Sequence, residues 1–193
     1  MEETILWQTF LKGDRASFEA LFNRYYKPLF RYGHKLIHDQ QLVDDCIQDL
    51  FFELWTGREG LSEIGSVKGY LFKALRYKLY RAARKDSRYD ALDEATQAQW
   101  ESSHESLMIA EERDDALRKR LHHFLDQLSP RQREAIELRF NNQMSYEEIS
   151  HIMSISYQAA VNLIYKSIKY LREHMVSIPT LLLSLSWYGY LIK

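Results

Sequence analysis

The chain has 193 residues, of which 46% are hydrophobic and 27% are charged, and its formal net charge is −1 at pH 7. This composition excludes an intrinsically disordered chain and suits one ordinary domain or two small ones. Seven glycines and three prolines are few, so the composition predicts an all-α fold. The single cysteine, Cys46, excludes an internal disulfide and a cysteine-based zinc site, and it favours a cytoplasmic location.

The N-terminal half predicts three consecutive helices. Apolar residues recur at helical spacing over residues 14–37 and again over residues 40–55. Residues 56–65 carry three glycines and are predicted to form a loop. A third helix is expected over residues 66–85.

The second predicted helix carries an acidic face beside its apolar stripe. Asp45 and Asp49 are four residues apart and share one side of the helix, with Glu53 one turn further on. Phe52 and Trp55 border this face, and a large aromatic side chain beside carboxylates is typical of a protein-binding hot spot. A solvated helix surface is the alternative interpretation.

The third predicted helix is strongly basic. Residues 64–85 contain seven Lys or Arg and no acid. Cations neutralise phosphates, and tyrosines between them can stack on unpaired bases at about 1–3 kcal/mol per base, which favours a separated DNA strand. Phe72 and Leu79 are expected in the core. The candidate DNA contacts are Lys73, Arg76, Tyr77, Tyr80, Arg81, Arg84 and Lys85.

The helical pattern stops after the basic helix. Residues 86–110 are rich in polar side chains and show no core pattern, and residues 86–115 contain ten acids against two bases. Such a segment is predicted to stay extended. The expected architecture is therefore two small helical domains joined by a flexible acidic linker.

The C-terminal half resumes the helical pattern. A helix is predicted over residues 111–127. Ser129 and Pro130 follow, which are an N-cap and a first-turn proline, and they predict a helix over residues 130–140.

The next two predicted helices form a helix-turn-helix. Ser145 and Glu148 have the spacing of a capping box and begin a helix that ends at residue 153. After a tight turn, Ser156 is expected to cap the last helix, over residues 157–174.

The last predicted helix has the composition of a recognition helix. Its apolar side, with Ala160 and Ile164, is expected to face inward and to leave a polar face for the major groove. Glutamine and asparagine can pair with adenine, and lysine can meet phosphate or guanine. The candidate contacts are Ser156, Tyr157, Gln158, Asn162, Tyr165, Lys166 and Lys169.

An apolar tail closes the sequence. Residues 178–192 are too few for a membrane span, which needs about 20 apolar residues, and they include Pro179. The acidic start of the chain lacks the basic and apolar regions of a signal peptide. Because exposing Trp187 and Tyr188 is costly, the tail is predicted to dock on the C-terminal domain or on a partner protein.

Three segments carry a family resemblance. Residues 43–55 read VDDCIQDLFFELW, residues 128–134 read LSPRQRE and residues 145–149 read SYEEI. Together with the basic run, they resemble the extracytoplasmic-function (ECF) sigma factors of bacterial RNA polymerase, over about residues 10–85 and 110–173. The segments SYQ and NLI in the last helix are most similar to versions common in Bacteroidetes.

The resemblance implies a sigma factor with region 2 at residues 1–85, a linker at 86–110, region 4 at 111–175 and a tail at 176–193. Region 2 would bind core RNA polymerase and melt the −10 element, and region 4 would bind the duplex −35 element. The loop at 56–65 would read a flipped −10 base. The −10 and −35 contacts implied are the two candidate sets above. The polymerase-binding residues implied are Asp45, Gln48, Asp49, Phe52 and Trp55.

The chain departs from the family pattern at three positions. Tyr77 stands where the family usually has asparagine, which alters the expected base preference. Val161 and Leu163 stand where many members have Lys or Arg, so a modest affinity for the −35 element is expected. An anti-sigma factor or another recruiting protein is therefore an expected partner, besides core polymerase and promoter DNA.

Two other classes of function stay open. A stand-alone helix-turn-helix repressor or activator would be a dimer on a palindromic operator. A helical carboxylate metalloprotein would need Glu-x-x-His pairs on facing helices, and the histidines are scattered. The sequence shows no phosphate-binding loop or nucleophile motif, so no catalytic residue, metal or cofactor is predicted and the chain is not expected to be an enzyme.

Overall fold

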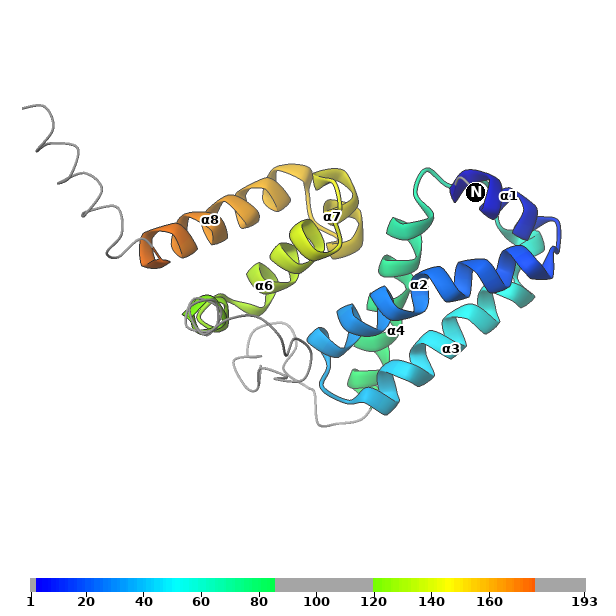
Figure 1. The fold of residues 1–193 in the computed structure, drawn as a ribbon, viewed down its shortest axis with the longest axis horizontal. Coiled ribbons are helices and arrows are strands. Elements are labelled where there is room, and N and C mark those ends of the chain that lie inside the picture. The colour runs from blue at the N-terminus through cyan, green and yellow to red at the C-terminus, as the bar shows by residue number, and fades with distance from the viewer. Residues whose placement is uncertain (1–2, 86–119, 176–193) are drawn as a thin grey trace, which may run out of the picture.

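A computed structural model describes residues 3–85 and 120–175, and every regular element in these ranges is helical. The predicted all-α fold is therefore confirmed. Helices form an N-terminal and a C-terminal group (Figure 1). The first comprises α1 (Glu3–Leu11), α2 (Arg15–Leu36), α3 (Gln40–Thr56), the 3-10 turn η1 (Arg58–Gly60) and α4 (Val67–Lys85). The second comprises a helix over 120–126, α6 (Pro130–Ile136), the π-helical turn η3 (Glu137–Asn141), α7 (Tyr146–Met153) and α8 (Tyr157–Met175).

The three predicted N-terminal helices form within a residue or two of their expected ends. Asp14 caps α2 by accepting a hydrogen bond from the Ser17 backbone N–H at 2.8 Å. Asp39 caps α3 in the same way through the Leu42 N–H at 3.0 Å. Helices α2, α3 and α4 pack on one another around a core that includes the fully buried Phe72 and Leu79. The prediction that these two side chains are core is confirmed.

The sequence reasoning did not anticipate α1. Trp7 and Phe10 of this helix are buried against the other N-terminal helices, and the Trp7 indole N–H donates to the Ser62 carbonyl at 3.2 Å. Gly13, at φ +88°, ends the helix before the cap of α2. The signal was present, because Leu6, Trp7, Phe10 and Leu11 share one helical face. Helix α1 thus ties the beginning of the chain to the loop before α4.

In the C-terminal group, the helix predicted over 130–140 takes two forms. It begins at the capping box of Ser129 and is α-helical to Ile136, and it then continues as the π-helical turn η3. The helix-turn-helix forms as predicted. Ser145 caps α7 and Ser156 accepts from the Ala159 N–H at 3.1 Å. The turn between them places Ser154 at φ 55°, in the left-handed region.

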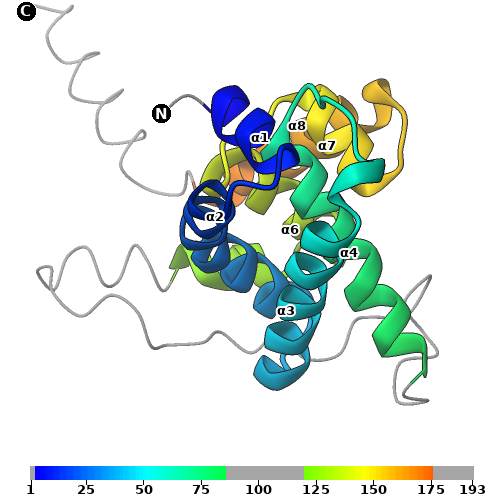
Figure 2. The ribbon, with the colours of Figure 1, turned by 90° about the vertical axis from the view of Figure 1, so that its right-hand side faces the viewer.

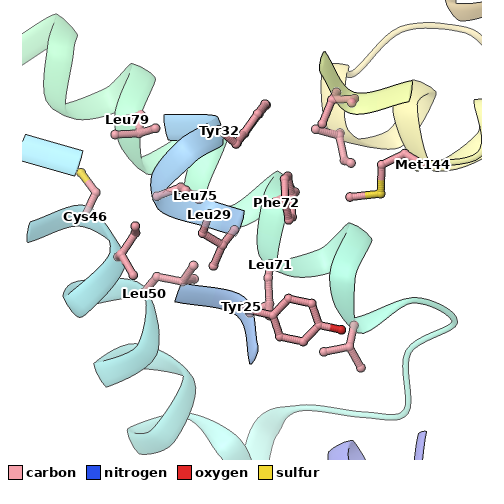
Figure 3. Packing of buried hydrophobic residues seen from close by; sticks show 14 of the residues in the cluster. Tyr25, Leu29, Tyr32, Cys46, Leu50, Leu71, Phe72, Leu75, Leu79 and Met144 are labelled. Atoms are coloured by element: carbon pink, nitrogen blue, oxygen red, sulfur yellow. The ribbon is translucent and has the colours of Figure 1, made fainter. Parts of the chain in front are cut away.

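The two groups pack directly on each other. Helix α7 lies against α4, and both groups contribute to one cluster of buried apolar residues. Figure 3 shows Met144 of the C-terminal group pointing toward Phe72 of α4. In Figure 2 the C-terminal helices lie behind α2, α3 and α4, in agreement with Figure 1. This contact was not predicted from the sequence.

Three predicted features lie outside the described residues. They are the linker at 86–110, the first half of the helix at 111–127 and the apolar tail at 176–193. Within the described ranges, none of the helices is both long and apolar enough to traverse a lipid bilayer.

Candidate protein and nucleic-acid interfaces

Helix α3 presents an acidic ridge to solvent. Its apolar side, with Ile47, Leu50 and Leu54, is buried against α2 and α4. The opposite side is exposed, and the Phe52 side chain there is 67% exposed although it is aromatic. We call this face the α3 ridge, and it consists of Asp45, Gln48, Asp49 and Phe52.

Trp55 was predicted to belong with the ridge, and it is a partly buried side chain that packs against the core. Its ring centroid is 5.0 Å from that of Phe18, and the Arg58 guanidinium lies 4.6 Å from the Trp55 ring. Arg58 also donates to the Trp55 carbonyl at 2.8 Å. Trp55 therefore fixes the end of α3 and the start of the following loop, and it stays partly exposed.

Helix α4 divides the predicted −10 residues between two faces. One face is exposed, and the Tyr77 ring on it is 66% exposed. The spacing of three or four residues aligns these side chains on one side of the helix. We call them the α4 stripe, and they are Lys73, Tyr77, Arg81 and Arg84. The side chain of Lys85 lies outside the described residues.

A groove of about 530 Å³ runs between the α3 ridge and the α4 stripe. Leu50 and Ala74 are among its apolar lining residues, and Leu61 of the glycine-bearing loop also lines it. Tyr77 and Arg81 of the α4 stripe also line the groove. Lys78 crosses it to Glu53, with 2.7 Å between Nζ and Oε1. An apolar floor with an aromatic ring and charged walls suits a planar polar group.

The other face of α4 is turned toward the C-terminal group. Arg76 Nε donates to the Glu134 carboxylate at 2.7 Å, and the Arg76 guanidinium lies 4.5 Å from the Tyr80 ring. Burial opposes the charge on Arg76, but the Glu134 carboxylate outweighs it and holds the pKa of Arg76 above its usual value. Arg76 and Tyr80 were predicted as −10 contacts together with the residues of the stripe. Their partner lies in another part of the chain, so periodicity could not find it.

Helix α8 offers a continuous exposed polar face. Gln158 Nε2 donates to Asn162 Oδ1 at 3.0 Å, and both side chains are exposed. Ala160 and Ile164 are buried on the opposite side, as predicted. Ser156 is exposed, but its hydroxyl is engaged as the helix cap. The α8 face consists of Tyr157, Gln158, Asn162, Tyr165, Lys166 and Lys169, all of them exposed.

Two family models match the chain. Residues 21–89 match the model of sigma-70 region 2, and residues 118–171 match the model of sigma-70 region 4. The chain belongs to the sigma-70 family. The resemblance to sigma factors is therefore confirmed, with both regions in the expected order, and α1 lies ahead of the matched ranges.

Solved structures show the same fold. One is CnrH in complex with the cytosolic domain of CnrY, which is 19% identical with a TM-score of 0.60, and the match covers 89% of this chain and 95% of CnrH. Another is the sigma factor RpoE in complex with the anti-sigma factor NepR from Bartonella quintana. RpoE is 21% identical with a TM-score of 0.57, over 84% of this chain and 98% of RpoE. A search of curated proteins finds no significant match.

Proposed function

We propose that the chain is an ECF-type sigma factor that binds core RNA polymerase and directs promoter recognition and DNA melting in the cytoplasm. The observation that carries this proposal is the coexistence of three chemically different exposed faces on the two sigma-70 regions. They are the α3 ridge, the α4 stripe and the α8 face. The phosphodiester chemistry belongs to the polymerase, and the chain itself is not an enzyme.

The α3 ridge suits a basic protein surface. Its carboxylates provide charge complementarity, and the exposed ring of Phe52 provides apolar area that gains when water is excluded. We assign core polymerase binding to this ridge. Trp55 contributes by fixing the end of α3, since most of its ring is packed inside region 2.

The α4 stripe and its groove suit a separated DNA strand. Lys73, Arg81 and Arg84 are exposed cations that can follow a phosphate backbone, and Tyr77 can stack on a base. The groove beside Tyr77 has room for a base turned out of the stack. We assign the −10 element to this surface, with Leu61 of the loop among the residues that line the base site.

The α8 face suits the major groove of the −35 element. Gln158 and Asn162 offer amides for adenine, and Lys166 and Lys169 offer charge for phosphates. Part of the Lys169 charge is engaged by Glu173, with 3.8 Å between Nζ and Oε1. This supports a modest electrostatic contribution to DNA binding. Since both solved relatives are complexes with a protein partner, we also propose an anti-sigma factor or recruiting protein for this chain.

The proposal is tested by reconstitution. The full chain is mixed with core RNA polymerase and host genomic fragments, and run-off transcripts are mapped. Specific start sites that require the chain are expected. Tight binding of the chain alone, as a dimer, to a palindromic duplex without any effect on polymerase would instead identify a stand-alone regulator.

Tyr77→Ala should impair melting without affecting duplex binding. Loss of one stacking contact of about 1–3 kcal/mol is expected to lower open-complex formation roughly 5- to 150-fold. Permanganate footprinting of unpaired thymines in the holoenzyme complex measures the effect. Tyr77→Phe keeps the ring and should retain most of the activity. Equal losses in the two variants would contradict stacking.

Asn162→Ala and Lys166→Ala should weaken −35 binding in different ways. Loss of the Asn162 amide is expected to cost about 1–3 kcal/mol and to relax selectivity at one base pair. Loss of the Lys166 charge should weaken all sequences alike and reduce the salt slope by about one. Holoenzyme binding to a panel of −35 variants at several salt concentrations separates the two effects. Identical profiles for the two variants would contradict the assigned roles.

A further inference from the structure

Helix α1 lies beside the loop that leads into α4, as Figures 1 and 2 both show. The Trp7 indole N–H donates to the Ser62 carbonyl at 3.2 Å, and Gln8 Nε2 donates to Glu63 Oε1 at 2.8 Å. Each of these hydrogen bonds joins residues that are 55 positions apart in the chain. Two adjacent residues of α1 therefore hold two adjacent residues of the loop.

The residues held by α1 are next to the groove. Leu61, which lines the groove, directly precedes Ser62 in the chain. Leu61 and Ile64 flank the two held residues, and both pack against the apolar core. Because a hydrogen bond fixes the Ser62 carbonyl, the backbone that carries the Leu61 side chain has little freedom to move. The position of Leu61 in the groove thus depends on α1.

Trp7 also supports a groove residue on α4. Its ring lies 5.8 Å from that of Tyr70 in an edge-on arrangement, and Tyr70 lines the groove. The Trp7 side chain is 2% exposed, and a close-packed interior resists displacement of such a ring. One buried side chain of α1 therefore stands behind groove residues on both the loop and α4.

The space around the loop differs along its length. The turn after α1 approaches the start of the loop, since a Cβ on Gly13 would lie 3.5 Å from Arg58 Nε. At Gly60 and Gly65, by contrast, a Cβ would meet no atom within 4 Å. These two glycines bracket residues 61–64. The hydrogen bonds from α1 thus act on a stretch of the loop that has open space at both ends.

We propose that Trp7 and Gln8 of α1 are positioning residues for base selection in the groove. By holding the loop, they fix the place of Leu61 and with it the space beside Tyr77. The inference rests on the proposed function, in which the groove receives a base of the −10 element. Neither residue touches the base, and each acts through the groove residues that it supports. Helix α1 therefore takes part in −10 recognition although it lies ahead of the range that matches region 2.

Base selection by shape needs groove walls that keep their position. A binding site discriminates well only when the residues that line it are held by packing and by further hydrogen bonds. A wall that yields admits bases that fit poorly, whereas stacking on Tyr77 stays available to every base. Loss of the hydrogen bonds from α1 should therefore lower selectivity between bases more than it lowers affinity for the preferred base.

The hydrogen bond at Gln8 can be broken and then restored. Gln8→Glu places a second carboxylate against Glu63, and the two like charges repel. Gln8→Glu/Glu63→Gln pairs an amide with a carboxylate again, in the opposite sense. Neither side chain is buried, so both variants should fold, which circular dichroism checks. The matched control is Thr4→Glu, which adds the same charge at an exposed position of α1.

The contact itself is measured in the free chain, without DNA. Solvent exchange of the Trp7 indole proton, followed by NMR, reports whether the Ser62 carbonyl stays in place. In Gln8→Glu this proton should exchange at least about threefold faster than in the parent chain, because the loop moves away from α1. The double variant and Thr4→Glu should stay within about twofold of the parent.

The consequence for base selection is measured with holoenzyme. Its affinity is determined for fork-junction promoter DNA that carries each of the four bases at each −10 position. The position at which Leu61→Ala changes selectivity most identifies the base that the groove receives. At that position, Gln8→Glu should lower the affinity ratio between the best and the worst base about two- to tenfold. The added Glu63→Gln should restore the ratio, and Trp7→Phe, which lacks the indole N–H, should lower it.

Several results would overturn the inference. One is unchanged exchange of the Trp7 indole proton in Gln8→Glu. Others are a loss of selectivity that Glu63→Gln does not restore, a loss of equal size in Thr4→Glu, and faster exchange without any loss of selectivity. Failure of the proposed function has a different signature: no chain supports specific initiation, or Leu61→Ala alters selectivity at no position, while the indole proton still responds to Gln8→Glu.

Discussion

Charge reversal at Asp49 combined with removal of the Phe52 ring should abolish specific initiation by the reconstituted holoenzyme. Both side chains are exposed on the α3 ridge, so the double variant Asp49→Lys/Phe52→Ala should fold normally. Hot-spot residues contribute about 2 kcal/mol or more each. The affinity for core polymerase is therefore expected to fall by at least about a hundredfold. Fluorescence anisotropy with labelled core enzyme measures it, and run-off transcription gives the functional readout.

The control for this variant makes the same kinds of change elsewhere on region 2. Glu19→Lys reverses an exposed charge on α2, and Ile5→Ala removes an exposed apolar side chain from α1. This double variant should bind core polymerase normally. If Asp49→Lys/Phe52→Ala initiates as well as the control, the α3 ridge does not bind polymerase and the proposed function fails.

Trp7→Ala should be the most destabilising single substitution in α1. The indole is 2% exposed, its ring lies 5.1 Å from Phe10 and 5.8 Å from Tyr70, and its N–H reaches the Ser62 carbonyl. Removing a buried aromatic side chain of this size costs about 3–5 kcal/mol. Urea unfolding followed by circular dichroism measures the change in the free energy of unfolding.

Ile5→Ala serves as the comparison on the same helix. Its side chain is 48% exposed, so its loss should change the free energy of unfolding by no more than about 0.5 kcal/mol. A cost below about 1 kcal/mol for Trp7→Ala would show that α1 is not anchored through this ring. Trp7→Phe retains most of the apolar volume and loses the hydrogen bond to Ser62, which separates packing from loop positioning.

The sequence predicted the elements whose signals are local. Ser145 and Ser156 were identified as caps because their partners lie three residues away in the chain. Apolar periodicity located α2, α3 and α4 for the same reason. The π-helical turn η3 was not predicted, because residues 137–141 carry no proline, glycine or other local mark that distinguishes it from an α-helical turn.

The candidate sites were predicted less completely, and the reason is again distance along the chain. The exposed members of the α3 ridge and the α8 face follow from helix periodicity alone. Arg76 and Tyr80 could not be separated from the α4 stripe, because Glu134 lies 58 residues after Arg76. Trp55 was assigned to the ridge because it borders the ridge in the sequence. Its ring instead packs on that of Phe18, which belongs to α2.

The position of α1 has a practical consequence for anyone who isolates region 2. The family match begins at residue 21, so a fragment cut there loses α1 together with Ser17 and Phe18 of the first turns of α2. Such a fragment would lack the rings that pack on Trp55 and Tyr70 and would leave a hollow there. The apolar rings of Trp55 and Tyr70 would then be exposed to water. A fragment that starts no later than Glu3 keeps that hollow filled, and any purification tag belongs upstream of it.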